Sequence, residues 1–207
     1  MKHDHTNAKH YGHLFVFEGP DDVGKTTLAH MLYEYLSRGG HPTELLSFPG
    51  NEPGTLGELV YRLYHDPLEF GLSKVSPIAM QLVVTAAHVE VIETRIKPLL
   101  RAGINVVLDR FWWSTWVYSS VEGVRQPQRD KLIEIELLSW EDIKPTTLLL
   151  ILRDGPFLDQ PANYPWHEIL SHYKQLLDSQ KGNVNTHVVI NDRDIGEAFR
   201  SVLSYVE

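Results

Sequence analysis

Hydrophobic residues fall into two patterns along this chain: short aliphatic runs, and longer segments in which apolar residues recur at helical spacing. The runs are typical of buried strands and the spaced segments of helices. Strands are predicted at residues 14–17, 43–48, 104–108, 146–152 and 187–190. Helices are predicted from Gly24 to Gly39, at 54–64, 77–101, 113–122, 128–140 and 166–179, and from 195 onward. This alternation predicts an α/β fold with a central parallel five-stranded sheet and helices on both faces.

The domain organisation is expected to be simple. With 207 residues the chain can bury one sizeable core, and neither a linker nor a shift in composition divides it. We expect a flexible polar tail over residues 1–12 and a single domain over 13–207. Histidines at positions 3, 5, 10 and 13 raise the alternative of a metal-binding tract. No carboxylate or cysteine pattern accompanies them, which favours the tail.

The composition of the chain excludes several kinds of chemistry and indicates where the protein is expected to be found. The chain has no cysteine, which excludes disulfides, thiolate catalysis and cysteine-ligated zinc and suits the cytoplasm. It has no apolar run of membrane-spanning length, so no membrane association is expected. Nineteen basic and 27 acidic residues give a net charge of −8, which argues against a broad surface for duplex nucleic acid.

Residues 19–27 read GPDDVGKTT and match the GxxxxGK[ST] pattern of a phosphate-binding loop. The two glycines let the backbone curl round an anion with its N–H groups inward. Lys25 then reaches the β- and γ-phosphates of ATP and Thr26 offers a hydroxyl to Mg²⁺, at the start of a helix whose dipole favours the same negative charge. A chance glycine turn is the alternative, but the strand before and the helix after favour the motif. The predicted phosphate-binding residues are Gly19, Asp22, Val23, Gly24, Lys25, Thr26 and Thr27.

Two further polar positions belong with this loop. Asp109 and Arg110 directly follow an aliphatic run, where the carboxylate can hold Mg²⁺ or a metal-bound water and the guanidinium can clamp a phosphate. A surface ion pair is the alternative for them. Asp21, inside the loop, adds a negative charge beside the bound phosphates. It is either a partner for a sugar hydroxyl or a solvated loop aspartate, and the residues alone leave both open.

Four segments of the chain resemble thymidylate kinases. FEGPDDVGKTT at 17–27 resembles the opening of that family, and EPGTLGE at 52–58 its substrate-side segment. AAHVEVIETRIKP at 86–98 resembles its long helix, and DRFWWSTWVY at 109–118 its DR[YH]xxSxxAY stretch. The resemblance covers residues 14–118 well; beyond them only the order of strands and helices agrees. It implies a P-loop nucleoside-monophosphate-kinase-like three-layer α/β/α fold, and transfer of the γ-phosphoryl group of MgATP to a deoxynucleoside monophosphate.

The resemblance also implies roles for residues and a partner. Asp21 would bind the deoxyribose 3′-hydroxyl, Thr115 the base edge, and Tyr118 the sugar face that excludes a 2′-hydroxyl. A homodimer packed through helices that include 77–101 is implied as well. The implied catalytic residues are Lys25, Asp109, Arg110 and Arg153, with Thr26 and Asp109 as Mg²⁺ ligands. The implied acceptor-binding residues are Asp21, Phe48, Asn51, Val84, His88, Arg110, Thr115 and Tyr118.

The chain departs from the family pattern at several of these positions. Asn51 stands where the family places an arginine that holds the acceptor phosphate, His88 where it has a base-recognising arginine, and Val84 where it has a stacking phenylalanine. An altered base preference is therefore expected. Trp112, Trp113 and Trp116 are candidates for a new stacking wall, with core packing as the more common alternative.

The region after the strand at 146–152 differs as well. Family members carry an arginine-rich lid there, whereas RDGPFLDQP at 153–161 is short and holds only Arg153. The phosphate-binding loop supplies no arginine in compensation, since Asp22 and Val23 occupy its middle. Arg153 must therefore act alone, or charge stabilisation during transfer is reduced.

Three functional hypotheses remain open. The leading one is an ATP- and Mg²⁺-dependent deoxynucleoside monophosphate kinase with an altered base preference. The second is a P-loop kinase that phosphorylates a hydroxyl of a deoxynucleoside or of a modified base in DNA, the one reading in which nucleic acid is a partner. The third is a nucleotide-binding protein with impaired catalysis. The joint presence of Lys25, Thr26, Asp109 and Arg110 favours phosphoryl transfer.

Overall fold

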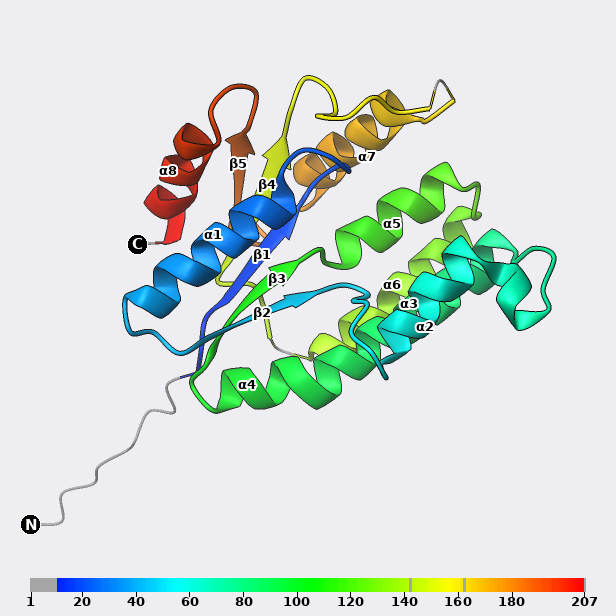
Figure 1. Cartoon of the computed structure of the whole chain (residues 1–207), viewed down its shortest axis with the longest axis horizontal. Coiled ribbons are helices and arrows are strands. Elements are labelled where there is room, and N and C mark those ends of the chain that lie inside the picture. Colours follow the sequence, from blue (N-terminus) through cyan, green and yellow to red (C-terminus); the bar gives the residue numbers. More distant parts are fainter. Residues whose placement is uncertain (1–10, 142, 162, 207) are drawn as a thin grey trace, which may run out of the picture.

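The computed structural model describes residues 11–141, 143–161 and 163–206, and its centre is one parallel sheet (Figure 1). Its strands stand in the order β2-β3-β1-β4-β5. All neighbouring strands pair in parallel, with Phe17 of β1 opposite Asp109 of β3. The strand bounds are β1 Leu14–Glu18, β2 Thr43–Ser47, β3 Asn105–Asp109, β4 Thr147–Leu152 and β5 Thr186–Ile190.

Helices cover both faces of the sheet and make three layers (Figure 1). One face packs against α1 and α8, and the other against the layer that holds α3 to α7. Helix α2 packs on α3. The bounds are α1 Lys25–Arg38, α2 Leu56–His65, η1 Pro67–Phe70, α3 Pro77–Val91, η2 Ile92–Ile96, α4 Lys97–Arg101, α5 Trp112–Val121, α6 Gln126–Trp140, α7 Trp166–Ser179 and α8 Ile195–Val206.

Alternate residues of each central strand enter two separate cores. In β1, Val16 packs with the α3 to α7 layer, while Phe15 and Phe17 pack against α1 and α8. All six residues of β4 are buried, as expected for a parallel strand covered on both faces. This burial fixes the strand register, because a slip by one residue would exchange the two faces.

The predicted fold class is confirmed, and the predicted elements are present with ends displaced by at most two residues. The segment predicted as one helix over 77–101 is helical throughout, but it contains a π-helical turn, η2. The short 3₁₀ helix η1 was not predicted. Its four residues are too few to show a periodicity.

The described part of the chain begins close to the edge of the folded core. Residues 1–10 of the predicted tail lie outside the described residues, whereas Gly12 already donates its N–H to the Leu100 carbonyl at 2.8 Å. The division into a tail and one domain stays a prediction.

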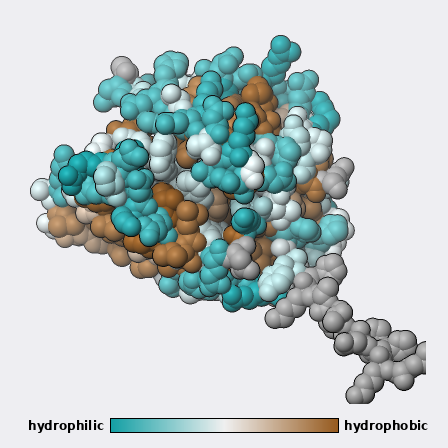
Figure 2. Space-filling model, turned by 180° about the vertical axis from the view of Figure 1, so that it is seen from behind, coloured by the Kyte–Doolittle hydropathy of each residue, from teal (hydrophilic) through white to brown (hydrophobic). Residues whose placement is uncertain are grey.

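Over the described ranges, no helix is both long and apolar enough to span a bilayer. Figure 2 shows hydrophobic surface at the lower left of the face seen from behind, the side on which α2, α3 and α6 lie.

Candidate functional site

The phosphate-binding loop joins β1 to α1 at the carboxyl edge of the sheet. Gly19 has φ 140° and Gly24 has φ 88°, values that side chains rarely allow. Gly19 also lies against the Ile151 backbone, where a Cβ atom would collide with the carbonyl oxygen. Gly24 is the N-cap residue of α1, so the first N–H groups of a 14-residue helix open toward the loop. This is the local geometry of an anion-binding loop.

Lys25 lies over this loop and is buried, with 5% of its surface exposed. Its ammonium donates to the Pro20 carbonyl, which holds the side chain along the loop. Burial, together with the nearby Arg110 charge, lowers the pKa of Lys25 to about 8. Lys25 therefore lies in the predicted phosphate site as an ammonium whose pKa is close to neutral pH.

Thr26 and Asp109 meet in space although 83 residues separate them in sequence. The Thr26 hydroxyl donates to Asp109 Oδ2 at 2.5 Å. Asp109 Oδ1 is buried and has no hydrogen-bond partner among the described residues. A hydroxyl beside an unpaired carboxylate oxygen is a donor set that suits Mg²⁺. Within the described ranges no three His, Cys, Asp or Glu side chains cluster as a metal site, so these ligands would share the ion with phosphate oxygens and water.

Arg110 and Asp21 form an ion pair across the site. Arg110 has φ 79°, an unusual conformation for a residue with a side chain, and its guanidinium lies over the Tyr118 ring at 5.5 Å from the centroid. Asp21 also accepts from the Tyr164 hydroxyl at 2.7 Å. Burial would raise the pKa of Asp21, but the charges of Arg110 and Lys25 outweigh it and hold that pKa well below its usual range. Asp21 is therefore a fixed negative charge, which rules out the freely solvated loop aspartate.

Glu18, the last residue of β1, is a part of the site that sequence reasoning missed. Its side chain is fully buried and accepts from the backbone N–H groups of Phe111 and Ser114 at 2.7 and 2.9 Å. It also accepts from the hydroxyls of Ser114 and Tyr173, at 2.9 and 3.0 Å. A charged residue at the end of an apolar strand was the available signal, but Phe111, Ser114 and Tyr173 lie 93 to 155 residues away.

The short segment after β4 contacts the phosphate-binding loop. Phe157 donates its N–H to the Asp22 carbonyl at 3.0 Å, and the Gln160 amide donates to the Asp22 carboxylate. Arg153 donates to the Asn191 carbonyl at 2.7 Å, and its guanidinium lies 3.8 Å from the centre of the Phe157 ring. Arg153 is thus held beside the loop by two contacts of its own.

Asn191, just after β5, is a second residue that sequence reasoning missed. It is 1% exposed and donates to the Val23 carbonyl at 2.7 Å. A Cβ atom on Gly24 would collide with its amide nitrogen. No sequence signal identifies this residue, because a single asparagine after a strand is common.

A cavity of about 490 Å³ lies between the start of α1 and the segment that follows β2. It brings together Thr26 and Asp109 with Phe48 and the exposed Asn51, all predicted site residues.

The segment 48–54, whose residues 48–52 line this cavity, leads into α2. The Thr55–Glu58 pair caps the start of that helix: Glu58 N–H donates to the Thr55 hydroxyl at 3.1 Å and Gly54 N–H to the Glu58 carboxylate at 2.7 Å. The 48–54 segment is therefore anchored at both of its ends, since Phe48 N–H donates to the Asp109 carbonyl at 2.9 Å.

His88 and Thr115, predicted to contact the base, converge on a carboxylate instead. His88 Nδ1 lies 3.0 Å from Glu136 Oε2, and the Thr115 hydroxyl donates to the same oxygen at 3.5 Å. All three side chains are buried, and the Phe48 ring stacks on His88 at 4.1 Å. Neither His88 nor Thr115 lines the cavity that Phe48 and Asn51 share. Glu136 was missed because nothing in the helical pattern of α6 distinguishes a buried glutamate.

The remaining candidates lie around this centre. Val84 is half-buried on α3, and no contact places it at the cavity. The tryptophans follow the core-packing alternative: Trp112 and Trp113 are buried in the core, and Trp116 lies half-buried against the Arg129 guanidinium and the His172 ring. They do not form a stacking wall at the site.

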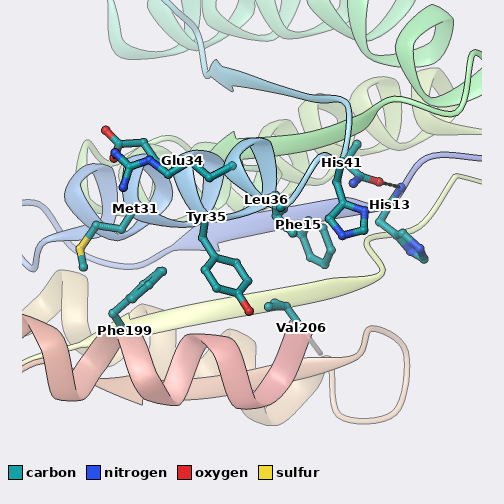
Figure 3. Close-up of a pocket in the computed structure, with 12 residues that line it drawn as sticks. His13, Phe15, Met31, Glu34, Tyr35, Leu36, His41, Phe199 and Val206 are labelled. Carbon is teal, nitrogen blue, oxygen red and sulfur yellow. Dashed lines mark hydrogen bonds and ion pairs between the residues drawn. The ribbon is translucent and has the colours of Figure 1, made fainter.

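A separate cavity of about 790 Å³ lies between α1 and α8 (Figure 3). Tyr35 of α1 points toward Phe199 and Val206 of α8 across it (Figure 3). It contains no residue of the phosphate-binding loop and none of the predicted site residues. The candidate active site is therefore the carboxyl edge of β1 and β3, where parallel α/β sheets bind ligands.

Comparisons with known proteins point to one family. The family model described as thymidylate kinase matches residues 17–138. A thymidylate kinase from Chlorobium chlorochromatii is 36% identical over 132 residues, 64% of this chain and 56% of that protein. One from Neorickettsia sennetsu is 31% identical over 142 residues, 69% of this chain and 66% of that protein. The chain thus spans between about half and two thirds of the length of these relatives.

Solved structures give the same fold. The thymidylate kinase of Ehrlichia chaffeensis superposes with a TM-score of 0.74 at 24% identity, covering 95% of this chain and 100% of that one. The enzyme of Candida albicans gives 0.71 at 21% identity, covering 95% and 91%. Because the family model spans more than half of the sequence and includes the loop, Asp109 and Arg110, this chain belongs to the thymidylate kinase family.

Proposed function

We propose that this protein transfers the γ-phosphoryl group of ATP to the phosphate of a deoxynucleoside monophosphate, with Mg²⁺. The observation that carries the proposal is the meeting of Lys25, Thr26, Asp109 and Arg110 at one edge of the sheet. Phosphoryl transfer needs donor and acceptor held in line and their developing charge stabilised, and little covalent chemistry from the protein. A site made of a phosphate cradle, metal ligands and two cations fits that requirement.

The donor half of the site is the phosphate-binding loop. The backbone of Gly19 to Thr27 and the N-terminus of α1 receive the phosphates of ATP, and Lys25 places its charge against them. Arg153, held by the Asn191 carbonyl and the Phe157 ring, is the one cation that the short segment after β4 brings to this side. Thr26 and Asp109 would hold Mg²⁺, which when bound neutralises charge on the transferred phosphoryl group.

The acceptor half combines the Asp21–Arg110 ion pair with the cavity that Asp109 lines, although neither Asp21 nor Arg110 lines that cavity itself. Arg110 binds the acceptor phosphate and Asp21 accepts from the sugar hydroxyl, so the loop serves both substrates. Tyr118, whose ring lies against the Arg110 guanidinium, packs on the sugar. Asn51 lines the cavity in place of a cation, which leaves Arg110 as the main charge for this phosphate.

The base preference is proposed to differ from thymine. His88 and Thr115, the positions that would contact the base, are both engaged by Glu136. Phe48 covers His88, and its ring lines the cavity together with that of Tyr61, so these two rings are the aromatic surface that an acceptor in the cavity meets. We therefore expect the base to be recognised by stacking on Phe48 more than by hydrogen bonds to α3.

A panel assay tests the proposed function. Purified protein is incubated with Mg²⁺, ATP and each common deoxynucleoside monophosphate in turn, with deoxynucleosides and short DNA as further acceptors, and ADP is measured. Formation of a deoxynucleoside diphosphate from at least one monophosphate supports the proposal. Phosphate transfer to nucleoside or DNA alone would select the hydroxyl-acceptor hypothesis, which the neutral Asn51 favours. ATP binding without any transfer would select the impaired one.

We further propose a homodimer formed through α3 and α6. These helices carry exposed apolar side chains: Leu82 is 50% exposed, Ile135 47% and Leu138 71%. Hydrophobic surface of this kind is typical of interfaces between copies of one chain. Sedimentation of the wild type as a dimer and of the Leu138→Glu variant as a monomer would support this assembly, whereas a wild type that sediments as a monomer would exclude it.

A further inference from the structure

Glu18 is the point at which three elements of the active site are joined. Its carboxylate accepts from Gly19 N–H in the phosphate-binding loop at 3.2 Å and from Phe111 N–H at the start of α5 at 2.7 Å. It also accepts from the Tyr173 hydroxyl of α7 at 3.0 Å. A fully buried carboxylate is costly unless donors replace the lost water. Here Oε1 receives two backbone donors, and Oε2 receives one backbone donor and two hydroxyls.

The hydrogen-bond network around Glu18 includes Arg110. Ser114, which donates to Glu18 through its N–H and its hydroxyl, also accepts from Arg110 Nη1 at 3.3 Å. Phe111, the residue next to Arg110, is the N-cap residue of α5 and donates to Glu18 through its N–H. The Phe111 side chain cannot cap the helix, so Glu18 supplies the missing acceptor. The carboxylate also lies where the helix dipole favours negative charge.

The Arg110 backbone needs such support. With φ 79° it lies in the left-handed region, which a residue with a side chain occupies at an energetic cost. Its own N–H donates to the Phe17 carbonyl at 2.9 Å, so the strained residue is held on one side by β1 and on the other by the Glu18 network. Burial is the main cause that raises the pKa of Glu18, and the Arg110 charge opposes it. The site thus retains a costly carboxylate where an apolar side chain would pack without that cost.

We propose that Glu18 is a positioning residue that fixes the turn after β3, and with it Asp109 and Arg110, relative to the phosphate-binding loop. The kinetic part of this proposal rests on the proposed kinase function. Glu18 touches neither substrate; it sets the distance between the loop that holds the donor and the arginine that holds the acceptor. A displacement of about 1 Å at such a point is enough to reduce transfer by about 100-fold.

Glu18→Gln is the main test, because glutamine keeps the volume but offers only one acceptor oxygen to these donors. Val16→Ala is the matched control, since Val16 lies in the same strand and is equally buried, but its apolar side chain can make no hydrogen bond to the turn. Melting temperature, kcat, both KM values and amide hydrogen exchange of residues 110–114 are compared. For Glu18→Gln we expect kcat to fall at least about tenfold, the acceptor KM to rise, the ATP KM to change less than about twofold, and exchange at Phe111 and Ser114 to accelerate. Val16→Ala should lower the melting temperature and leave kcat and exchange at the turn unchanged.

Two results would overturn the proposal: wild-type kcat and wild-type exchange in Glu18→Gln, or an equal loss of kcat in Val16→Ala. Where Glu18→Gln does not fold, Ser114→Ala replaces it, since it removes one hydroxyl from the network and the contact to Arg110. A wild-type protein without turnover on any monophosphate would refute the kinase function. The exchange comparison would still decide whether Glu18 holds the turn.

Discussion

The Asp21 carboxylate and the Arg110 guanidinium, 89 residues apart in sequence, form an ion pair that joins the phosphate-binding loop to the turn after β3. Tyr164 donates to the second oxygen of the same carboxylate. Asp21 thereby lies between the proposed donor and acceptor sites and orients the cation that would hold the acceptor phosphate. This contact explains why the loop tolerates a carboxylate beside ATP.

Asp21→Asn should weaken the acceptor site and spare the donor site. The amide keeps the shape but loses the charge that orients Arg110 and accepts from the sugar hydroxyl. We expect kcat/KM for the deoxynucleotide to fall by about 10- to 100-fold and the ATP KM to change by less than about threefold. Steady-state kinetics with each substrate varied in turn measures both. Tyr164→Phe, the matched control, removes one hydrogen bond and should lower kcat/KM by less than about tenfold. An ATP KM that rises as much as the acceptor KM contradicts the assignment of Asp21.

The pH dependence of ATP binding should report Lys25. Its pKa is about 8 in the ligand-free protein, lowered by burial and by Arg110. Below that value the ammonium is charged and attracts phosphate; as the pH rises through it, the proton and the attraction are lost. We expect kcat/KM for ATP to decline with an apparent pKa near 8, because this ratio reports the free enzyme. Lys25→Arg stays charged and should abolish the decline, even at lower activity. If kcat/KM for ATP still declines with rising pH in Lys25→Arg, another titrating group causes the decline.

Asp109→Asn should change the requirement for Mg²⁺. The substitution removes the charge from the carboxylate whose Oδ1 is unpaired and whose Oδ2 accepts from Thr26. We expect kcat to fall by about 100-fold or more and the Mg²⁺ concentration for half-maximal rate to rise. A Mg²⁺ titration at fixed ATP measures both values. Thr26→Val should raise that concentration as well, and a normal Mg²⁺ dependence in both variants would place the ion elsewhere.

Asn51→Arg and His88→Arg should have different effects on thymidylate phosphorylation. Asn51 is exposed at the cavity, so an arginine there can reach an acceptor phosphate. His88 is buried against Glu136, so an arginine there would pair with that carboxylate. We expect Asn51→Arg to lower the KM for thymidylate by about tenfold and His88→Arg to give no improvement. Improvement by His88→Arg alone would show that Glu136 does not control this position.

The parts of the site that could be predicted from the sequence are those with a local signal. Gly19, Gly24 and Lys25 carry one continuous motif, and Asp109 ends an aliphatic strand, which places it at the ligand-binding edge of the sheet. The strands and helices could be predicted as well, because the spacing of hydrophobic residues is also a local signal. Short non-periodic pieces such as η1 could not.

The other parts depend on contacts between distant segments. Glu136 meets His88 across 48 residues and Asn191 meets Val23 across 168. A glutamate on a helix or an asparagine after a strand is ordinary until the fold brings its partner near. For Trp113 the sequence left two alternatives: its place beside the motif made it a candidate for stacking, with core packing as the more common alternative, and tertiary packing put it in the core.

The most direct test of the account follows the phosphoryl group itself. ATP labelled at the γ-phosphate is mixed with Mg²⁺ and single deoxynucleoside monophosphates, and the products are separated for the wild type and for Lys25→Met. The account predicts label in a deoxynucleoside diphosphate with the wild type, and its loss with the variant. Label that appears only in inorganic phosphate, or in a product that lacks the acceptor's own phosphate, would contradict it.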